Sequence, residues 1–315
     1  MSMLTNPSEL VSSFNYKGLI YGQPGIGKTT VALSASNPVL LDFDKGLHRV
    51  EKIYQVPSLQ PTCYQDVINL LNSNELAGFD TIVIDTLGKL IDMIISSNHV
   101  PKKNDGCTPS MQGWSVLKVQ FQNLLKMVAS KNKNILFVAH EKEEKTDDNI
   151  VKRIDVSGSS GKDLLKELDF MGYMQAKGKK RTISFSPEES FYAKNSMKLN
   201  DIIEVPDTAN GNTFFVEKIE GAIKEKMEDD NKMKAKYDDL VLHLEKTIKG
   251  ADTPEKLTEI KSNCYDNEEY PHIWNSRFVV RNLISNFSKE KGWIFDADTK
   301  SFKEVVSDGN TKDNA

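Results

Sequence analysis

Residues 22–30 read GQPGIGKTT and match the pattern G-x-x-x-x-G-K-[ST]. The apolar segment KGLIYG ends at the first of these glycines, and a helix-favouring segment begins at Lys28. A glycine-rich turn between a strand and a helix is the context that the phosphate-binding loop, or Walker A motif, requires. The loop therefore limits the chain to folds in which a buried strand leads directly into a helix N-terminus.

The residue types in this loop suit a triphosphate and a divalent cation. Glycines let successive N–H groups point at phosphate oxygens, and the following helix adds the positive end of its dipole. Lys28 offers a positive charge to the β- and γ-phosphates, and the Thr29 hydroxyl offers a ligand to Mg²⁺. We expect ATP and Mg²⁺ as cofactors, with the nucleotide held by Gly22, Gln23, Pro24, Gly25, Ile26, Gly27, Lys28, Thr29 and Thr30.

Short apolar segments alternate with amphipathic ones along the first two thirds of the chain. The apolar segments predict strands buried on both faces at 17–22, 38–44, 80–86 and 134–140. Helical spacing of apolar residues predicts helices at 28–36, 64–72, 87–96 and 112–130. This alternation indicates an α/β fold with a mostly parallel central sheet flanked by helices.

Three further segments have their own character. Residues 97–111 and 141–162 are polar or charged without a period, and we expect exposed, mobile loops there. Residues 169–194 predict short strands around a basic turn, a hairpin-like extension of the sheet.

Asp85 ends the apolar segment TIVID, where a P-loop enzyme places the Walker B aspartate of its magnesium site. We therefore expect Thr29 and Asp85 to serve the metal. Ring ATPases of the AAA+ kind usually carry a catalytic glutamate after this aspartate, and here the position holds Thr86. The carboxylate that activates water should then lie elsewhere.

Two other strand ends carry polar side chains that open onto the same edge of a parallel sheet. Asp44, in preference to Asp42, is the candidate base, and the alternative is that both carboxylates cap the next element. His140 ends the strand in FVAHE, from which it could reach the γ-phosphate or the attacking water. The alternative for His140 is a structural role.

Composition and charge exclude several classes of protein. A net charge of -4 excludes a uniformly basic nucleic-acid binder, and the 38% hydrophobic and 27% charged residues are ordinary for a globular protein. The cysteines, Cys63, Cys107 and Cys264, lack the number and spacing of a disulfide framework or a cysteine-rich zinc site. Without a long apolar run or a signal-like start, we expect no membrane contact and a cytoplasmic protein.

The composition changes near residue 220 and predicts two domains. Residues 1–220 form the nucleotide-binding domain, and residues 221–306 form a small, mainly helical domain. Within the latter, Thr253 followed by Pro254 is the signature of a helix start. The last residues, 307–315, are polar and predicted to be a flexible tail.

The motifs GQPGIGKTT, LLDFDKG, TIVIDT and FVAHE, followed by DFMGYM and AKNSMKL, resemble one family over residues 15–205. The chain is similar to the RecA-like P-loop ATPases encoded by phages, specifically the Sak-type single-strand annealing or recombination ATPases. The resemblance implies a RecA-like core and a Mg²⁺-dependent ATPase. That family often has glutamate where this chain has Asp44. A shorter carboxylate reaches the water less easily, which implies either slow hydrolysis or a base other than Asp44.

The resemblance also implies a homo-oligomer. In that family ATP binds at subunit interfaces, and a basic residue from the neighbouring subunit completes the site. Lys179, Lys180 and Arg181 in the basic turn are the candidates here, with Arg181 as the catalytic one. The alternative is a solvated basic turn.

By the same resemblance, single-stranded DNA would bind through the loops after the third and fourth strands. The candidate phosphate contacts are Lys102, Lys103, Lys152, Arg153 and Lys162. The neighbouring acidic run EKEEKTDD partly cancels these charges, and ordinary flexible loops are the alternative.

The function that the resemblance implies is ATP-dependent single-stranded DNA binding, annealing or strand exchange in phage recombination and repair, in the cytoplasm of a bacterial host. DNA could stimulate hydrolysis, and a single-strand-binding or replication protein could be a partner. The alternative is a nucleotide-dependent switch or loader that recruits a replication partner and has little DNA affinity. A small-molecule kinase is disfavoured because no arginine-rich lid follows the core.

Overall fold

The computed structural model describes residues 15–146, 149–156, 165–207 and 212–304. The chain separates into two compact units, Ser13–Lys226 and the segment from Met227 onward. This boundary falls inside a helix, whereas the change in composition placed it at residue 220. The predicted tail at 307–315 lies outside the described residues.

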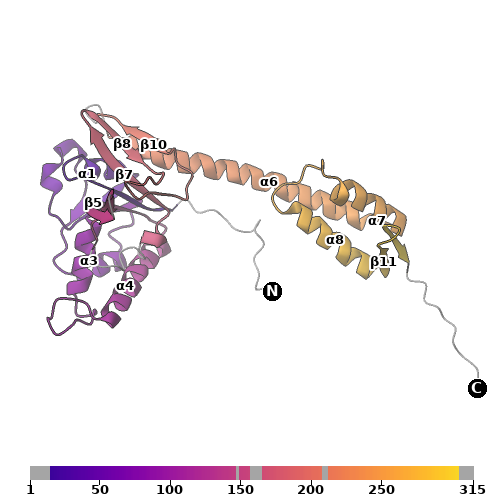
Figure 1. The fold of residues 1–315 in the computed structure, drawn as a ribbon, viewed down its shortest axis with the longest axis horizontal. Coiled ribbons are helices and arrows are strands. Elements are labelled where there is room, and N and C mark those ends of the chain that lie inside the picture. Colours follow the sequence, from indigo (N-terminus) through magenta and orange to yellow (C-terminus); the bar gives the residue numbers. More distant parts are fainter. Residues whose placement is uncertain (1–14, 147–148, 157–164, 208–211, 305–315) are drawn as a thin grey trace, which may run out of the picture. The chain divides into compact units, whose positions relative to one another are not determined.

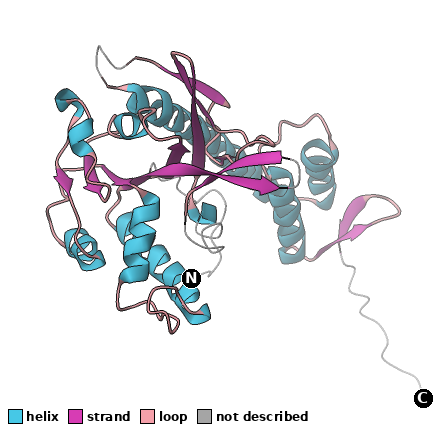
Figure 2. Cartoon of the chain, turned by 60° about the vertical axis from the view of Figure 1, so that its left-hand side comes forward, coloured by secondary structure: helices cyan, strands magenta, loops and turns pink. Residues whose placement is uncertain are grey.

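One sheet of ten strands, counted over the described residues, runs through the first unit (Figure 2). Its order is β10-β8-β7-β1-β5-β4-β2-β3, with β6 paired to β5 and β9 paired to β7. From β7 to β3 every neighbouring pair is parallel. The strands are β1 (Lys17–Gly22), β2 (Pro38–Asp42), β3 (Ser58–Leu59), β4 (Thr81–Asp85), β5 (Asn134–Thr146), β6 (Asn149–Ile154), β7 (Phe170–Lys177), β8 (Lys180–Ser184), β9 (Lys194–Asn195) and β10 (Ile202–Val205).

Helices cover both faces of this sheet. Figure 1 shows α3 and α4 on the side opposite to α1. The apolar stripes of α2, α3 and α4 pack against alternate residues of the central strands, such as Leu19, Ile82 and Phe137. The helix bounds are α1 (Lys28–Ala32), α2 (Tyr64–Asn72), α3 (Leu87–Ser96) and α4 (Met111–Ser130). The mostly parallel sheet with flanking helices confirms the predicted α/β class.

The register of the parallel strands brings their carboxyl ends to one edge. Gly22 pairs with His140, and Asp42 pairs with Asp85. Side chains that are far apart in sequence therefore meet at this edge, as expected for a parallel sheet.

Several predicted boundaries differ from the structure. β2 ends at Asp42, so Asp44 lies in the following turn. α1 ends at Ala32, and residues 33–36, predicted to belong to this helix, form turns and bends. The charged segment after His140, predicted as a mobile loop, continues β5 and pairs in antiparallel fashion with β6 from Glu141↔Ile154 to Thr146↔Asn149. Alternating charges pair across this ribbon, and a search for apolar strands overlooks such pairing. The segment 97–110 joins α3 to α4 and is mostly exposed, as predicted.

The second unit is mainly helical. Its apolar core contains the buried side chains of Leu244, Ile248, Leu257, Val280 and Trp293. The predicted helix start is present, since the Thr253 hydroxyl accepts from the Lys256 N–H at 3.3 Å. The elements are the C-terminal part of α6 (Gly221–Lys249), α7 (Pro254–Lys261), α8 (Ser276–Glu290), β11 (Trp293–Asp296) and β12 (Ser301–Glu304).

None of the helices in the described part of the chain combines the length and the apolar character that crossing a membrane requires.

Candidate functional site

The loop 23–27 connects β1 to α1 at the carboxyl edge of the sheet. Gly27 has φ 94°, in the left-handed region that favours glycine, and it precedes the first residue of α1. Gly22 permits a close approach of backbones, because a Cβ there would lie 2.1 Å from the carbonyl oxygen of Met174. The structure thus brings all nine predicted loop residues, 22–30, into one strand–turn–helix.

Lys28 lies beneath this loop and is only 5% exposed. Its Nζ donates to the carbonyl oxygens of Gly22, at 2.9 Å, and Gln23, at 2.6 Å. Burial lowers the pKa of Lys28 to about 8, and the nearby carboxylates of Asp85, Glu141 and Asp44 oppose that shift. An anionic ligand next to the Lys28 amine would therefore stabilise its protonated, charged form.

Thr29 and Asp85 meet as the motif predicts. The Thr29 hydroxyl donates to Asp85 Oδ2 at 2.6 Å, and the Asp85 side chain is buried at the end of β4. Burial raises the pKa of Asp85, with the bond from Thr29 opposing this and the charge of Asp44 adding to it. A bound cation would relieve the cost of burying this carboxylate.

Asp44 and His140 also lie together. Asp44 Oδ2 is 3.4 Å from His140 Nε2, and His140 Nδ1 is buried without a hydrogen-bond partner. The backbone N–H groups of Phe43 and Asp44 donate to the Asp85 carbonyl oxygen, at 2.7 and 3.3 Å, which places the turn carrying Asp44 beside the end of β4.

Asp42, unlike Asp44, binds backbone N–H groups of the next turn. Its carboxylate accepts from the backbone N–H groups of Gly46, at 2.8 Å, and Leu47, at 3.0 Å, and it is 1% exposed. The capping alternative therefore describes Asp42, whose oxygens hold the next turn, while Asp44 keeps a partly exposed carboxylate toward His140.

Arg181 reaches the phosphate-binding loop of its own chain. One guanidinium nitrogen, Nη1, lies 2.9 Å from where a Cβ on Gly27 would sit. The other, Nη2, donates to the Pro206 carbonyl oxygen at 3.0 Å. Lys179 and Lys180, in and beside the hairpin turn, are exposed. The structure places Arg181 over the loop of the same chain. The contact with a neighbouring subunit that the resemblance implies stays a prediction.

Glu141 is a carboxylate of this region that sequence reasoning missed. Its side chain is 7% exposed, Oε1 lies 3.3 Å from Lys152 Nζ, and Oε2 is buried without a hydrogen-bond partner. Its charge is also one of those acting on Lys28. The signal was available, because Glu141 directly follows His140 at a strand that reaches the carboxyl edge.

A segment far away in sequence braces α1. Asn212 Nδ2 donates to the Thr30 carbonyl oxygen at 2.6 Å, and the Phe215 N–H donates to Ser34 Oγ at 3.0 Å. Glu220, 3% exposed, accepts from the Tyr16 hydroxyl at 2.6 Å and from the N–H of Ser36 at 3.2 Å. These contacts fix the C-terminal end of a helix that has only five residues of its own.

The predicted DNA contacts are not gathered at one place. Lys102 Nζ donates to the Ser96 carbonyl oxygen at 3.1 Å, and Lys103 is exposed between α3 and α4. Lys152 pairs with Glu141 and Glu143, and these charges balance one another within the hairpin.

Arg153 and Lys162 are the other two predicted DNA contacts. Arg153 pairs with Glu144 at 2.5 Å and lies 3.9 Å from the centre of the Tyr192 ring. Lys162 lies outside the described residues. Lys152 and Arg153 thus already have acidic partners.

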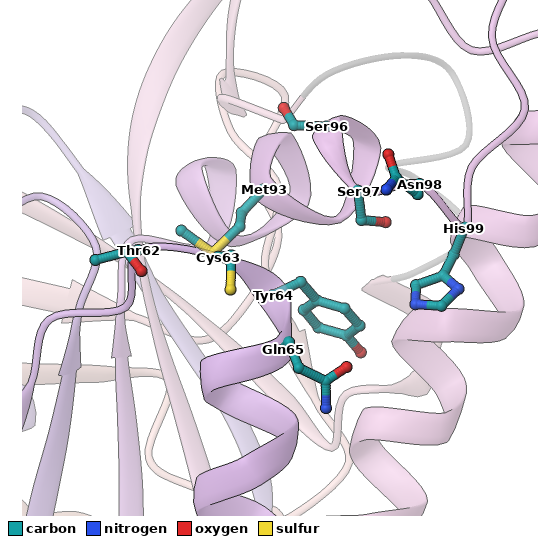
Figure 3. Close-up of a pocket in the computed structure, with 9 residues that line it drawn as sticks. All are labelled: Thr62, Cys63, Tyr64, Gln65, Met93, Ser96, Ser97, Asn98 and His99. Atoms are coloured by element: carbon teal, nitrogen blue, oxygen red, sulfur yellow. The ribbon is translucent and has the colours of Figure 1, made fainter.

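A separate pocket of about 500 Å³ lies between the first turn of α2 and the end of α3 (Figure 3). Its lining includes the Cys63 thiol, the Tyr64 ring and His99. It contains none of the predicted site residues.

The donors at the loop fit a magnesium–triphosphate ligand. A hydroxyl and a carboxylate in contact are the few protein oxygens that Mg²⁺ needs when phosphates supply others. Lys28 and Arg181 bring two positive charges to this loop, at Gly22 and at Gly27 respectively. Thr29, Asp85 and the loop amides would hold the cation and phosphates, and Asp44 and His140 stand beside them.

Comparison with known families agrees with this geometry. A family model described as an AAA domain matches residues 14–197, more than half of the chain. A search of curated proteins found no match.

Proposed function

Since the chain belongs to the AAA domain family, we propose that it is a Mg²⁺-dependent ATPase whose hydrolysis uses the Asp44–His140 pair and its own Arg181. The observation that carries the proposal is the meeting of Lys28, Thr29 and Asp85 at one end of a parallel sheet. Two separate sequence motifs, the loop at 22–30 and the strand end at Asp85, meet there with the donor types that a metal–triphosphate needs.

Each residue has a distinct task in this proposal. Lys28 and the loop amides bind the β- and γ-phosphates, and Thr29 and Asp85 hold the cation, which when bound neutralises charge on the phosphates. The Asp44 carboxylate, in contact with His140, orients a water and takes its proton. The Arg181 guanidinium stabilises charge that develops on the γ-phosphate.

We further propose that single-stranded DNA is the macromolecule on which this ATPase acts, as an oligomer in the cytoplasm of a phage-infected bacterium. The support is the resemblance to Sak-type recombination ATPases over residues 15–205. The alternative, a nucleotide-dependent loader with little DNA affinity, is favoured by one observation: Lys152 and Arg153 are paired with acidic residues.

The experiment that tests the enzyme is phosphate release from ATP and Mg²⁺, with and without single-stranded DNA. Lys28→Ala should abolish hydrolysis and strongly weaken ATP binding, while Asp44→Asn should leave binding unchanged and slow turnover by about 100-fold or more. Asp42→Asn is the matched comparison, because Asp42 caps a turn and its loss should act on stability. Turnover of the Asp44 variant at the wild-type rate would assign the base to another residue, with Glu141 next in line.

A further inference from the structure

The second unit carries an exposed face that combines aromatic rings with arginines. Trp274 is 55% exposed and Phe278 is 60% exposed, an unusual pair of large apolar side chains to leave in water. Arg277 and Arg281 are also exposed. On α8 (Figure 1) residue 281 follows residues 277 and 278 by about one turn, so these three positions share one side of the helix.

Local structure holds the Trp274 ring in place. Its backbone has φ 48°, a conformation that is uncommon for a bulky residue. The indole packs on the Tyr237 ring, with centroids 5.3 Å apart, and the Tyr237 hydroxyl donates to Asn275 Oδ1 at 2.8 Å. The ring is thus supported from α6 on one side and open to solvent on the other.

The segment that carries Trp274 and α8 is basic. Between Glu269 and Glu290 the chain has no acidic residue, and it carries Arg277, Arg281 and Lys289. By contrast, the acidic residues Asp238 and Asp239 directly follow Tyr237, the residue of α6 that supports the indole. Arg277 in addition lies 5.6 Å from the centre of the Tyr265 ring, which extends the aromatic surface beside it.

We propose that this face, formed by Trp274, Arg277, Phe278 and Arg281, is a binding platform for single-stranded nucleic acid. The inference rests on the DNA part of the proposed function and deepens it, because it moves the contact from the charge-paired hairpin to the second unit. Exposed rings stack on bases of any sequence, and arginines beside them neutralise backbone phosphates. A purely apolar partner would not need the arginines, and a duplex would not offer unstacked bases.

The test uses the full-length protein and a fluorescently labelled oligothymidylate. Trp274→Ala and Phe278→Ala should each weaken binding by about tenfold. Arg277→Gln and Arg281→Gln should each reduce the slope of log affinity against log salt by about 0.7. Matched controls on the same unit, Ile294→Ala and Lys300→Gln, alter an exposed apolar and an exposed basic residue outside the face and should bind as the wild type does.

Tryptophan fluorescence gives a second readout that does not depend on activity. Oligothymidylate should quench the wild-type emission, and Trp274→Phe should bind with near wild-type affinity while losing most of that quenching, since phenylalanine still stacks. Trp114 and Trp293 remain in this variant, so folding can be followed by their emission.

The outcomes separate the platform from the proposed function. Wild-type affinity in all four face variants would overturn the platform alone and leave DNA binding to another surface. Absence of binding by the wild type at low salt, with or without nucleotide, would overturn the DNA role and the platform with it. A change in oligomeric state in Phe278→Ala without a change in DNA affinity would assign the face to a second copy of the chain and overturn the proposal.

Discussion

Lys28 shows how much of this site depends on the burial of a single charge. Its ammonium donates to two carbonyl oxygens of the loop that it serves, and burial lowers its pKa to about 8 from an ordinary value near 10.5. Phosphate oxygens would stabilise the protonated form. Nucleotide binding should therefore be linked to proton uptake by this residue.

The sign of the pH effect follows from that linkage. Between pH 8 and about 10.5 the unfolded lysine keeps its proton while the folded one loses it, so the Lys28 contribution to the free energy of unfolding increases with pH in this window. ATP needs the charged form, so ATP affinity should decrease above pH 8 by up to about tenfold per pH unit. Equilibrium titrations from pH 7 to pH 9.5 measure this, with Lys28→Arg as the control because arginine stays charged. An equally steep loss in the arginine variant would show that another group is responsible.

Arg181 raises the question of which chain it serves. Its guanidinium lies over Gly27 of the same chain and is held by the Pro206 carbonyl oxygen. We expect Arg181→Ala to reduce turnover by about 100-fold or more, since an electrostatic donor at the reacting phosphate is lost. Lys180→Ala, the exposed neighbour, should turn over at the wild-type rate.

Mixing variants distinguishes action within a chain from action across an interface. When Lys28→Ala and Arg181→Ala proteins are combined, neither chain holds a complete site if Arg181 acts on its own loop, so phosphate release should stay at the level of the separate proteins. Recovery of activity in the mixture would show that Arg181 acts on a neighbouring subunit.

At the scale of elements, α1 depends on a distant segment for its position. A five-residue helix cannot fix itself, and the residues 212–220 supply hydrogen bonds to its end. Glu220 is central because the Tyr16 hydroxyl and the Ser36 N–H both donate to its buried carboxylate. Removal of that acceptor leaves buried donors without a partner.

Glu220→Ala should therefore lower the free energy of unfolding by about 2–6 kcal/mol, at about 1–3 kcal/mol for each of the two unsatisfied donors. Denaturant unfolding measures this loss. Glu225→Ala, at an exposed position in the first turns of α6, should change stability by less than about 0.5 kcal/mol. Tyr16→Phe should cost less in the Glu220→Ala background than in the wild type, since its partner is already gone. Additive losses would show that the two side chains do not act as a pair.

The β5–β6 hairpin is an element whose charges are used internally. Lys152 and Arg153 pair with acidic residues of β5, and the pairing explains why a segment rich in charge forms strands. DNA binding through this segment stays a prediction, and it would have to compete with these ion pairs.

At the scale of the whole molecule, the protein combines a nucleotide-binding unit with a helical unit that has its own apolar core. If the first unit hydrolyses ATP and the molecule binds single-stranded DNA, the two ligands should be coupled, and the coupling must be reciprocal. We expect ATP to tighten DNA binding by about 5- to 150-fold and DNA to tighten ATP binding by the same factor.

DNA titrations with no nucleotide, with ADP and with a non-hydrolysable ATP analogue measure this coupling, and ATP titrations at saturating DNA measure its reciprocal. Lys28→Ala removes the nucleotide and should leave only the basal DNA affinity. Equal DNA affinity in all nucleotide states would contradict the coupling and support two independent activities.

The sequence by itself determined the class of fold and the phosphate-binding loop, because both depend on local patterns. Apolar segments of strand length alternate with helical ones, and GQPGIGKTT needs only its own glycines and flanks to be recognised. The helices predicted at 64–72 and 87–96 also depend on local apolar spacing, and the structure has them with the same bounds.

Only the tertiary structure decided which of the remaining polar residues meet. Asp42 and Asp44 are alike in sequence. In the structure the Asp42 carboxylate accepts from the Gly46 N–H, whereas the Asp44 carboxylate faces His140, which lies 96 residues further along the chain on β5. The order of strands in the sheet likewise decides that Arg181 lies near the loop of its own chain and that the charge of Glu141 acts on Lys28. Such contacts depend on strand register and side-chain packing between distant segments, which no local pattern encodes.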